Sequence, residues 1–443
     1  MRAKPFLFLA LIGFQVFSAA SDIPAGPEAP LAILVRNALE HNPSLAAQRQ
    51  EVLAAASAVG PAGALPDPFL DTELTMVSVS GPRLEDALSR GSSIGISQTL
   101  PFPGKRRLRK GAAEAEAAAS ALEWEARRAR LAGDVVEAAL GHASIRRLME
   151  LNGETKSALD AAARGAAALY AAGRASQMEV LMAQAALTES SADRLDLERR
   201  LAVSEARLAD LSGGALDREA LARVDLPPPE PLPPLDSLLN AALEGAPEVR
   251  LARSRLESRS LQLAVAEAEV KPDFSLSLRY RFNDPTMGGS DFLTLMAGVS
   301  LPFFHKRDRY APLRQEALAR REEARLQVEA EENRLRYEIA EAWHGAQRGA
   351  SAAALAEGEL VIQARQAYES AVAGYAAGQV DFPTLQRALS SLHAARAFAW
   401  TARADHHAAA ARLRSILGRT LPEAGGGPPS AAQSGPSAGG RTP

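Results

Sequence analysis

The sequence predicts an α+β membrane protein in which long α-helical coiled-coil hairpins are combined with a few short β-strands. Three observations predict this class. The same order of elements occurs twice along the 443 residues. Each copy contains a very long stretch rich in Ala, Leu, Glu and Arg, which favour helices. Each copy also contains two short segments in which apolar and polar residues alternate, as in a strand with one apolar face.

The chain begins with a stretch that predicts export, a signal peptide over residues 1–20. Arg2 and Lys4 give it a positive start, an apolar run over 5–17 follows, and small residues then offer a cleavage site. An uncleaved anchor is the alternative. The apolar run is too short to span a bilayer as a helix, and no later stretch is apolar for long enough. If the chain enters a membrane, it must therefore do so as a β-barrel.

Composition and motifs exclude several classes of function. The net charge of -3 is too close to neutral to indicate nucleic-acid binding. The absence of cysteine excludes disulfides and thiolate metal sites. No catalytic motif of the hydrolase, zinc-protease, phosphate-loop or dinucleotide type occurs, so we expect no enzyme, no cofactor and no metal site. His406 and His407 are adjacent and would point about 100° apart on a helix, which does not make a chelating pair.

An internal repeat organises the chain. Four landmarks of the first half return in the same order about 200 residues later, which indicates duplication. The landmark pairs are 31–43 and 235–247, 67–69 and 272–274, 100–106 and 301–307, and 170–173 and 375–378. The first repeat covers 21–224 and the second covers 236–421. Between them the Pro-rich segment 225–235 is a stiff, extended linker. The tail over 422–443, made mostly of Gly, Pro, Ser and Ala, is expected to be disordered.

Each repeat is expected to contain the same elements in the same order. The first has a helix over 31–60, strands over about 69–79 and 92–100, a long helix over 105–169 and a return helix over 176–211. The second has helices over 235–270 with a break near Pro247, strands over about 273–282 and 292–301, a long helix over 307–374 and a return helix over 383–417. At about 1.5 Å per residue the long helices would extend on the order of 100 Å, which is too long for an ordinary globular domain.

The alternating segments decide between a membrane protein and a soluble coiled coil. Residues 274–282 alternate without an error between an aromatic and aliphatic row and a polar row that holds Arg279 and Arg281. Asp71 and Glu73 fall on the polar row of the first repeat. This pattern favours strands with apolar side chains toward lipid and these four charges toward a water-filled lumen. A half-buried strand in a soluble sheet is the alternative.

Four strands are too few to close a barrel that spans a membrane, which needs roughly eight or more. The subunits must therefore pool their strands. Two copies give about eight strands, a barrel filled by its own side chains, and three copies give about twelve, wide enough for an open pore. The inner face appears entirely polar in the sequence, which favours three copies.

Basic runs follow the second strand of each repeat, Lys105-Arg106-Arg107 and Lys306-Arg307. They fall at the first turn of a helix, where the helix dipole disfavours cations. Some other interaction must therefore favour them. Contact with phosphate headgroups of outer-membrane lipid is one interpretation, and a solvated charge run is the other.

Together these features resemble the outer-membrane efflux protein family of TolC-like channels, and in particular the branch found with heavy-metal cation exporters. The resemblance covers about 31–417. It rests on the duplicated strand-strand-long-helix order, on the run Leu-Pro-Phe-Pro-Gly-Lys-Arg at 100–106, and on the two Tyr-x-x-Gly turns. It implies a homotrimer with a 12-stranded outer-membrane barrel and a periplasmic helical tunnel that docks on a periplasmic adaptor protein and an inner-membrane efflux pump. The chain would be a passive conduit, with heavy-metal cations among its cargo.

By the same resemblance the two turns form the tip of the tunnel. Tyr170, Gly173, Tyr375 and Gly378 would contact the adaptor there, and the two glycines would control opening. Each glycine suits the left-handed position after a helix end.

The resemblance also implies an acidic ring just after the second turn, and here the sequence departs from the pattern. Asp381 comes early, and Arg387 is basic. Glu179 is the nearest acidic candidate in the first repeat. These three residues are candidate charges of the tunnel entrance, and each is also consistent with a solvated charge on a helix.

The alternative from a different class is an exported structural coiled-coil protein, a periplasmic scaffold, which the helices alone would support. It predicts a soluble product after cell fractionation, whereas the channel predicts a heat-resistant oligomer in outer-membrane extracts. Met178 and Met182 share a helix face near the tip, which favours core packing over contact with a soft metal ion.

Overall fold

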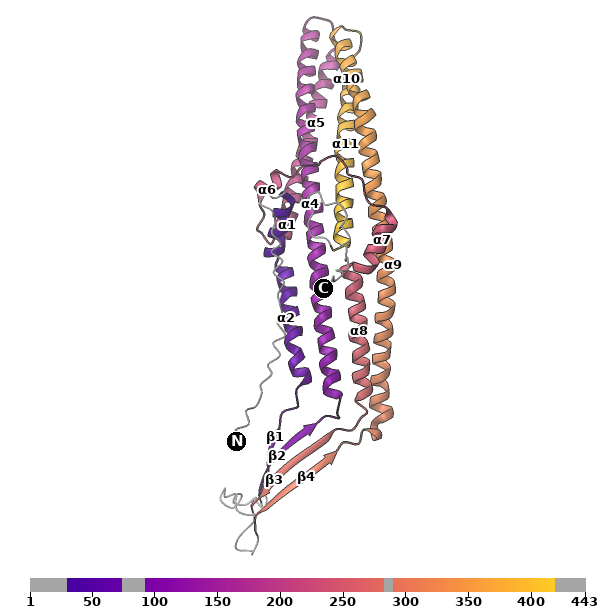
Figure 1. Cartoon of the computed structure of the whole chain (residues 1–443). Coiled ribbons are helices and arrows are strands. Elements are labelled where there is room, and N and C mark those ends of the chain that lie inside the picture. The colour runs from indigo at the N-terminus through magenta and orange to yellow at the C-terminus, as the bar shows by residue number, and fades with distance from the viewer. Residues whose placement is uncertain (1–29, 74–91, 283–289, 419–443) are drawn as a thin grey trace, which may run out of the picture.

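Figure 1 shows a computed structural model of the chain, which describes residues 30–73, 92–282 and 290–418. The molecule is elongated. Helices run along most of its length, and the strands lie together at one end. The expected signal peptide, the tail over 422–443 and the part of the first strand beyond Glu73 lie outside the described residues.

The first repeat begins with two helices in place of the single helix expected over 31–60. Asn42 separates them, and its side-chain Oδ1 accepts a 3.0 Å hydrogen bond from the Leu45 backbone N–H. Pro43 then occupies the first helical position, which lacks a hydrogen-bond partner anyway. The helices of this repeat are α1 (Pro30–His41), α2 (Pro43–Gly63), α4 (Lys105–Ala171), α5 (Gln177–Leu211) and the short α6 (Arg218–Ala222).

The second repeat has the same order, with a long helical path that contains two π-helical segments. In place of one α-helix over 307–374, α9 and α10 are preceded and joined by five-residue π-helices. The sequence contained no signal for these wide turns. The elements are α7 (Leu235–Gly245), α8 (Pro247–Ala268), η2 (Pro302–His305), η3 (Lys306–Tyr310), α9 (Ala311–Leu355), η4 (Ala356–Leu360), α10 (Val361–Ala376) and α11 (Phe382–Ile416).

Four antiparallel strands form one sheet in the order β1-β2-β3-β4. They are β1 (Phe69–Glu73), β2 (Ser93–Leu100), β3 (Phe274–Arg281) and β4 (Phe292–Val299). The central pair, β2 and β3, joins the two repeats, with Gly95 opposite Arg279. Because β1 and β4 each have only one neighbour, both edges of the sheet are open within one subunit.

Small residues allow the long helices to pack closely. α4 lies against α2, α5, α8 and α11, and α9 lies against α8 and α11. Ala132 and Ala139 of α4 are buried in the core beside α1. At Gly349 of α9 an added Cβ would lie 2.7 Å from the backbone N of His406 in α11, so a larger residue would push these two helices apart. No helix in the described residues has both the length and the apolar content required to cross a bilayer.

The Pro-rich linker crosses the bundle between α6 and α7 (Figure 1). Residues along it contact the helices that it passes. Asp225 forms a 3.0 Å ion pair with Arg147 of α4. Leu226 is buried in the core of the first repeat. Further along, the Trp343 indole N–H of α9 donates a 2.9 Å hydrogen bond to the Pro233 carbonyl. The linker is therefore anchored to helices of both repeats.

Candidate functional site on the strand face, the repeat junction and the helix tip

The four charges expected on the polar strand face lie together. Arg279 of β3 donates a 2.6 Å hydrogen bond to Asp71 and a 3.0 Å hydrogen bond to Glu73, both of β1. Arg281 lies 3.8 Å from the same Glu73 carboxylate. Two arginines of the second repeat are therefore neutralised by two carboxylates of the first.

Gly95 makes this arrangement possible, and sequence reasoning missed it. It lies on β2 directly between Asp71 and Arg279 in the register. A Cβ added at Gly95 would lie 2.9 Å from an Asp71 carboxylate oxygen and 3.3 Å from the Arg279 Nε. The missing side chain thus leaves the space through which the arginine reaches across β2.

The opposite face of the sheet is apolar and exposed. One row across all four strands consists of Leu70, Ile96, Leu278 and Leu295, which are 42 to 68% exposed. Exposed leucine and isoleucine at this density on one sheet face mark a surface that is covered by another apolar medium or partner.

One detail corrects the sequence interpretation of an entirely polar inner face. The register places Phe69 of β1 and Met296 of β4 in one row with Ser97 and Ser277. Phe292 of β4 likewise shares a row with Arg281. The charged face therefore also carries three apolar side chains on its edge strands, Phe69 of β1 and Phe292 and Met296 of β4.

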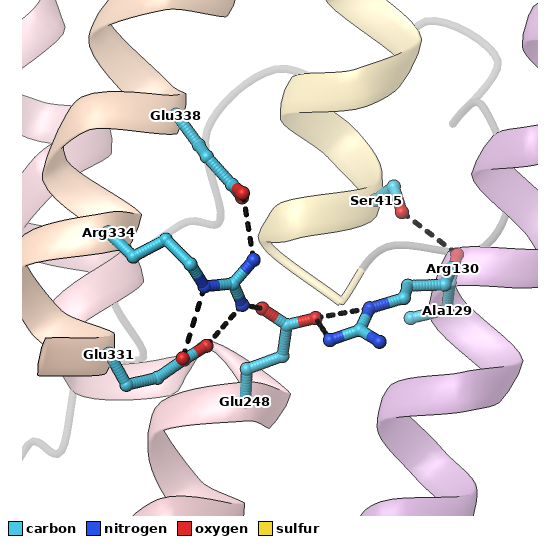
Figure 2. A network of polar contacts seen from close by, with 7 residues as sticks. All are labelled: Ala129, Arg130, Glu248, Glu331, Arg334, Glu338 and Ser415. Carbon is cyan, nitrogen blue, oxygen red and sulfur yellow. Dashed lines mark hydrogen bonds and ion pairs between the residues drawn. The ribbon is translucent and has the colours of Figure 1, made fainter. Parts of the chain in front are cut away.

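A second polar cluster joins the repeats halfway along the helices (Figure 2). Glu248 of α8 accepts hydrogen bonds of 2.5 Å from both Arg130 of α4 and Arg334 of α9. Arg334 also contacts Glu331 and Glu338 of its own helix. The Glu248 side chain is only 15% exposed, whereas the two arginines that contact it are partly exposed.

The electrostatics of this cluster follow from its three carboxylates and two guanidinium groups. The hydrogen bond from Arg334 to Glu331 and the nearby carboxylates raise the pKa of the guanidinium further above its usual value. Burial favours a higher pKa for Glu331, but the hydrogen bond and charge of Arg334 outweigh it and the pKa is lowered. Arg334 and Glu331 therefore both stay ionised throughout the physiological range.

The tip of the helical end is formed by two matched turns. Gly173 and Gly378 have φ angles of 70° and 75°, as expected for the left-handed position. After the glycines, the Arg174 N–H donates to Leu169 O and the Gln379 N–H donates to Gly374 O, each at 2.8 Å. These bonds satisfy carbonyls at the helix ends and reverse the chain.

The two tyrosines expected at the tip differ in their surroundings. Tyr170 is 49% exposed, whereas Tyr375 is 8% exposed and packs edge-on against Phe382 with ring centroids 6.2 Å apart. Burial, with a smaller contribution from the charge of Glu179, raises the pKa of Tyr375. Only Tyr170 is available for contact from outside in one subunit.

The three candidate entrance charges have local structural partners. Ser176 and Glu179 form a capping box at the start of α5, and Asp381 caps α11 by accepting a 3.1 Å hydrogen bond from the Thr384 N–H. Arg387 Nε lies 3.4 Å from the Pro383 carbonyl. The Ser-x-x-Glu spacing was the available signal for the capping box. The hydrogen bonds from the Thr384 hydroxyl and N–H lower the pKa of Asp381.

Met182 and His406 have structural partners as well. Met182 packs into the tip core, while Met178 is 69% exposed. The His406 ring is buried and lies 2.8 Å from the Ala346 carbonyl. In the described part of the chain, no group of three His, Cys, Asp or Glu side chains is placed to hold a metal ion.

The basic runs divide into two kinds of residue. Lys105 is 2% exposed and lies 2.9 Å from Asp273 and 2.8 Å from the Lys271 carbonyl, so for this lysine both interpretations, headgroup contact and a solvated charge, are wrong. Arg106 and Arg107 are exposed, as are Lys306 and Arg307. Burial of the first cation behind the strand end is the reason for the difference.

A sheet with one charged and one exposed apolar face, continued by long helical hairpins, defines a channel subunit of the outer membrane. The chain belongs to the outer membrane efflux protein family, whose model matches residues 34–214 and 238–419. The family consists of transport channels, not enzymes. The chain is thus located in the outer membrane with a helical extension into the periplasm, and the predicted family and fold class are confirmed.

Solved structures share the fold. The outer membrane protein VceC from Vibrio cholerae matches with a TM-score of 0.73 and 22% identity, covering 89% of this chain and 99% of that one. The open state of the MtrE channel of Neisseria gonorrhoeae matches with a TM-score of 0.73 and 19% identity, covering 88% of this chain and 89% of that one. CusC matches with a TM-score of 0.72 and 18% identity, covering 88% of this chain and 92% of that one. A comparison with curated proteins found no match.

Proposed function

We propose that three copies of this chain form the passive exit duct of a tripartite efflux system, receiving cargo from an inner-membrane pump through a periplasmic adaptor. The observation that carries the proposal is the two-faced sheet with its two open edges. One face holds the paired charges of Asp71, Glu73, Arg279 and Arg281, and the other exposes aliphatic rows. In lipid, open edges are too costly to persist, so β1 of one copy must pair with β4 of the next.

The paired charges favour a conduit without a tight binding site. Because Arg279 is already paired with Asp71 and Glu73, an ion in the lumen meets charges that are largely neutralised. Weak interaction along the path allows cargo to leave quickly. The residues Phe69, Phe292 and Met296 then lie on the two strands that pair across each subunit boundary and add apolar surface there.

At the other end we propose that the two turns dock on the adaptor. The side chain of one turn reaches the other, since a Cβ at Gly378 would lie 3.6 Å from the Arg174 guanidinium. Tyr170 and Met178 expose apolar surface beside them. Glu179, Asp381 and Arg387 remain proposed entrance charges, in addition to their local partners.

Heavy-metal cations as cargo rest on the resemblance to that branch of the family. A strain that lacks its own exit duct and carries the matching pump and adaptor tests both the duct function and the metal cargo. Expression of this chain should restore resistance to the pump's substrate. Restoration for organic compounds alone would overturn the metal assignment and leave the duct intact.

Pore formation is tested on the purified protein. We expect a heat-resistant oligomer in outer-membrane detergent extracts and discrete conductance steps in planar bilayers. A water-soluble product without conductance would overturn the proposal in favour of the periplasmic scaffold.

A further inference from the structure

A groove of about 520 Å³ lies where the first repeat passes from the sheet into α4. One wall is apolar and the other is basic. The apolar wall includes Leu65, Leu100 and Phe102, and the basic wall consists of Arg106, Arg107 and Lys110. This combination of a hydrocarbon wall and clustered cations suits an amphiphilic anion.

The apolar wall continues the exposed apolar face of the sheet. Leu100 lies opposite Phe274 in the register, and Phe274 lies opposite Val299. Phe102 extends the row beyond the strand end, because its ring stacks on Phe274 with centroids 6.4 Å apart. The groove therefore opens at the helix-side end of the same surface that, under the proposed function, lies in lipid.

The cations near this end of α4 are divided between two directions. Lys105 and Arg109 point inward and pair with carboxylates of the second repeat, at 2.9 Å from Asp273 and 2.6 Å from Glu269 respectively. The basic wall points the other way. These two inward cations are therefore accounted for by the fold.

Few carboxylates lie close enough to neutralise the basic wall. Arg106 donates its Nε–H to the Gly63 carbonyl at 2.8 Å, and Lys110 lies 3.3 Å from Glu114. Neither Arg106 nor Arg107 has a carboxylate within ion-pair distance among the residues that the structure describes. Both lie in the first turn of α4, where the helix dipole raises the cost of a positive charge.

We propose that this groove binds the phosphate headgroup of an anionic phospholipid in the periplasmic leaflet of the outer membrane. The phosphate lies between Arg106, Arg107 and Lys110, and an acyl chain runs along Leu65 and Leu100. A guanidinium binds phosphate oxygens through parallel N–H donors. The apolar wall distinguishes a lipid from free phosphate, because Leu65 and Leu100 are 42% and 37% exposed without a chain against them.

The inference rests on the proposed membrane location and is tested on the purified full-length oligomer. Native mass spectrometry with added phosphatidylglycerol or phosphatidylcholine measures which lipid stays bound. We expect preferential retention of phosphatidylglycerol. The triple variant Arg106→Gln, Arg107→Gln, Lys110→Gln should weaken it at least about tenfold, since it removes all three cations of the basic wall.

A matched variant removes the same charge elsewhere. Arg194→Gln, Arg199→Gln, Arg200→Gln changes three exposed arginines of α5, which lies far from the sheet (Figure 1), and should leave lipid retention unchanged. Leu65→Ser should also weaken retention, because it makes the hydrocarbon wall polar. Equal retention by the triple variant and the wild type would overturn the inference. It would also be overturned if glycerol 3-phosphate displaced the bound lipid as effectively as phosphatidylglycerol itself.

Bilayer conductance separates this inference from the proposed function. If the wild type conducts but shows no preference for phosphatidylglycerol, only the lipid site is wrong. If the wild type does not conduct, the proposed function itself fails. A triple variant that no longer assembles would show that the groove is a contact between subunits and would also overturn the lipid site.

Discussion

Arg279 of β3 lies 2.6 Å from Asp71 of β1, although β2 runs between the two strands. The contact joins the second repeat to the first on the charged face of the sheet. It is possible because the intervening residue of β2, Gly95, has no side chain. The four-stranded sheet is therefore held by charge across its width as well as by backbone hydrogen bonds.

Replacing Gly95 tests this arrangement. Gly95→Val places atoms within the space between Asp71 and Arg279, where even a Cβ would be 2.9 Å from the carboxylate. We expect a loss of about 1–3 kcal/mol from overpacking and ion-pair rupture. The measurement is the temperature at which the oligomer dissociates on a gel. Gly141→Ala on α4 meets open space and is the control. Equal dissociation temperatures for the two variants would contradict the prediction.

Glu248 tests the junction halfway along the helices. Glu248→Gln leaves Arg130 and Arg334 facing each other without the carboxylate that both contact. Since Arg130 and Arg334 are 60% and 41% exposed, solvent screens part of the effect, and we expect a loss of about 1–2 kcal/mol. Thermal unfolding in detergent measures it. Glu219→Gln, whose ion pair with Arg223 is 3.9 Å long and fully at the surface, should change stability by less than about 0.5 kcal/mol.

Gly378 tests the proposed docking tip. Gly378→Val forces a β-branched residue into a φ of 75°, at a local cost of about 1–2 kcal/mol. The turn should change shape while the distant sheet stays intact. We expect conductance in bilayers to persist and resistance in cells with the matching pump and adaptor to fall. Full resistance in cells would argue against docking at this turn. Gly153→Ala, in open space on α4, is the control.

One buried histidine, His142, and two partly buried histidines, His393 and His407, give the helical part a pH dependence. Burial lowers the pKa of His142, His393 and His407, so each is neutral in the folded chain at a pH where the unfolded chain still binds a proton. The stabilisation that comes from keeping these histidines neutral should therefore be fully present above about pH 6.5, and it should be lost as the pH falls toward their pKa values in the folded chain. The melting temperature at pH 7.5 should exceed that at pH 5. The slope should shrink in His142→Gln, and a flat profile would refute the assignment.

Much of the fold was readable from the sequence because the patterns are local. The alternation over 274–282 and the duplicated landmarks require only neighbouring residues and one internal comparison. The break before Pro43 was also readable, since Asn42 is a good N-cap and the second repeat breaks before Pro247. The π-helical segments had no local pattern that marks them.

The site was harder to predict from the sequence, because it depends on strand register and on contacts between residues far apart in the chain. No residue near Lys105 in the sequence indicates that this lysine will be buried beside Asp273. Likewise, no residue near Gly95 indicates that Arg279 will lie opposite it. The four charges that we predict to face the lumen follow from alternation alone, and only the pairing of β1, β2 and β3 shows that they meet. The apolar edge residues of the polar face follow from the same register.

The wide turns of the second repeat have a consequence for the evolution of the duct. The helical path from Lys306 to Ala376 uses more residues than α4; it begins nearer the strands, and both hairpins end at about the same height (Figure 1). A π-turn takes up an inserted residue as a local bulge and lets the regular spiral resume beyond it. Small insertions in one arm of a duplicated gene can thus be accommodated without one hairpin outgrowing its twin.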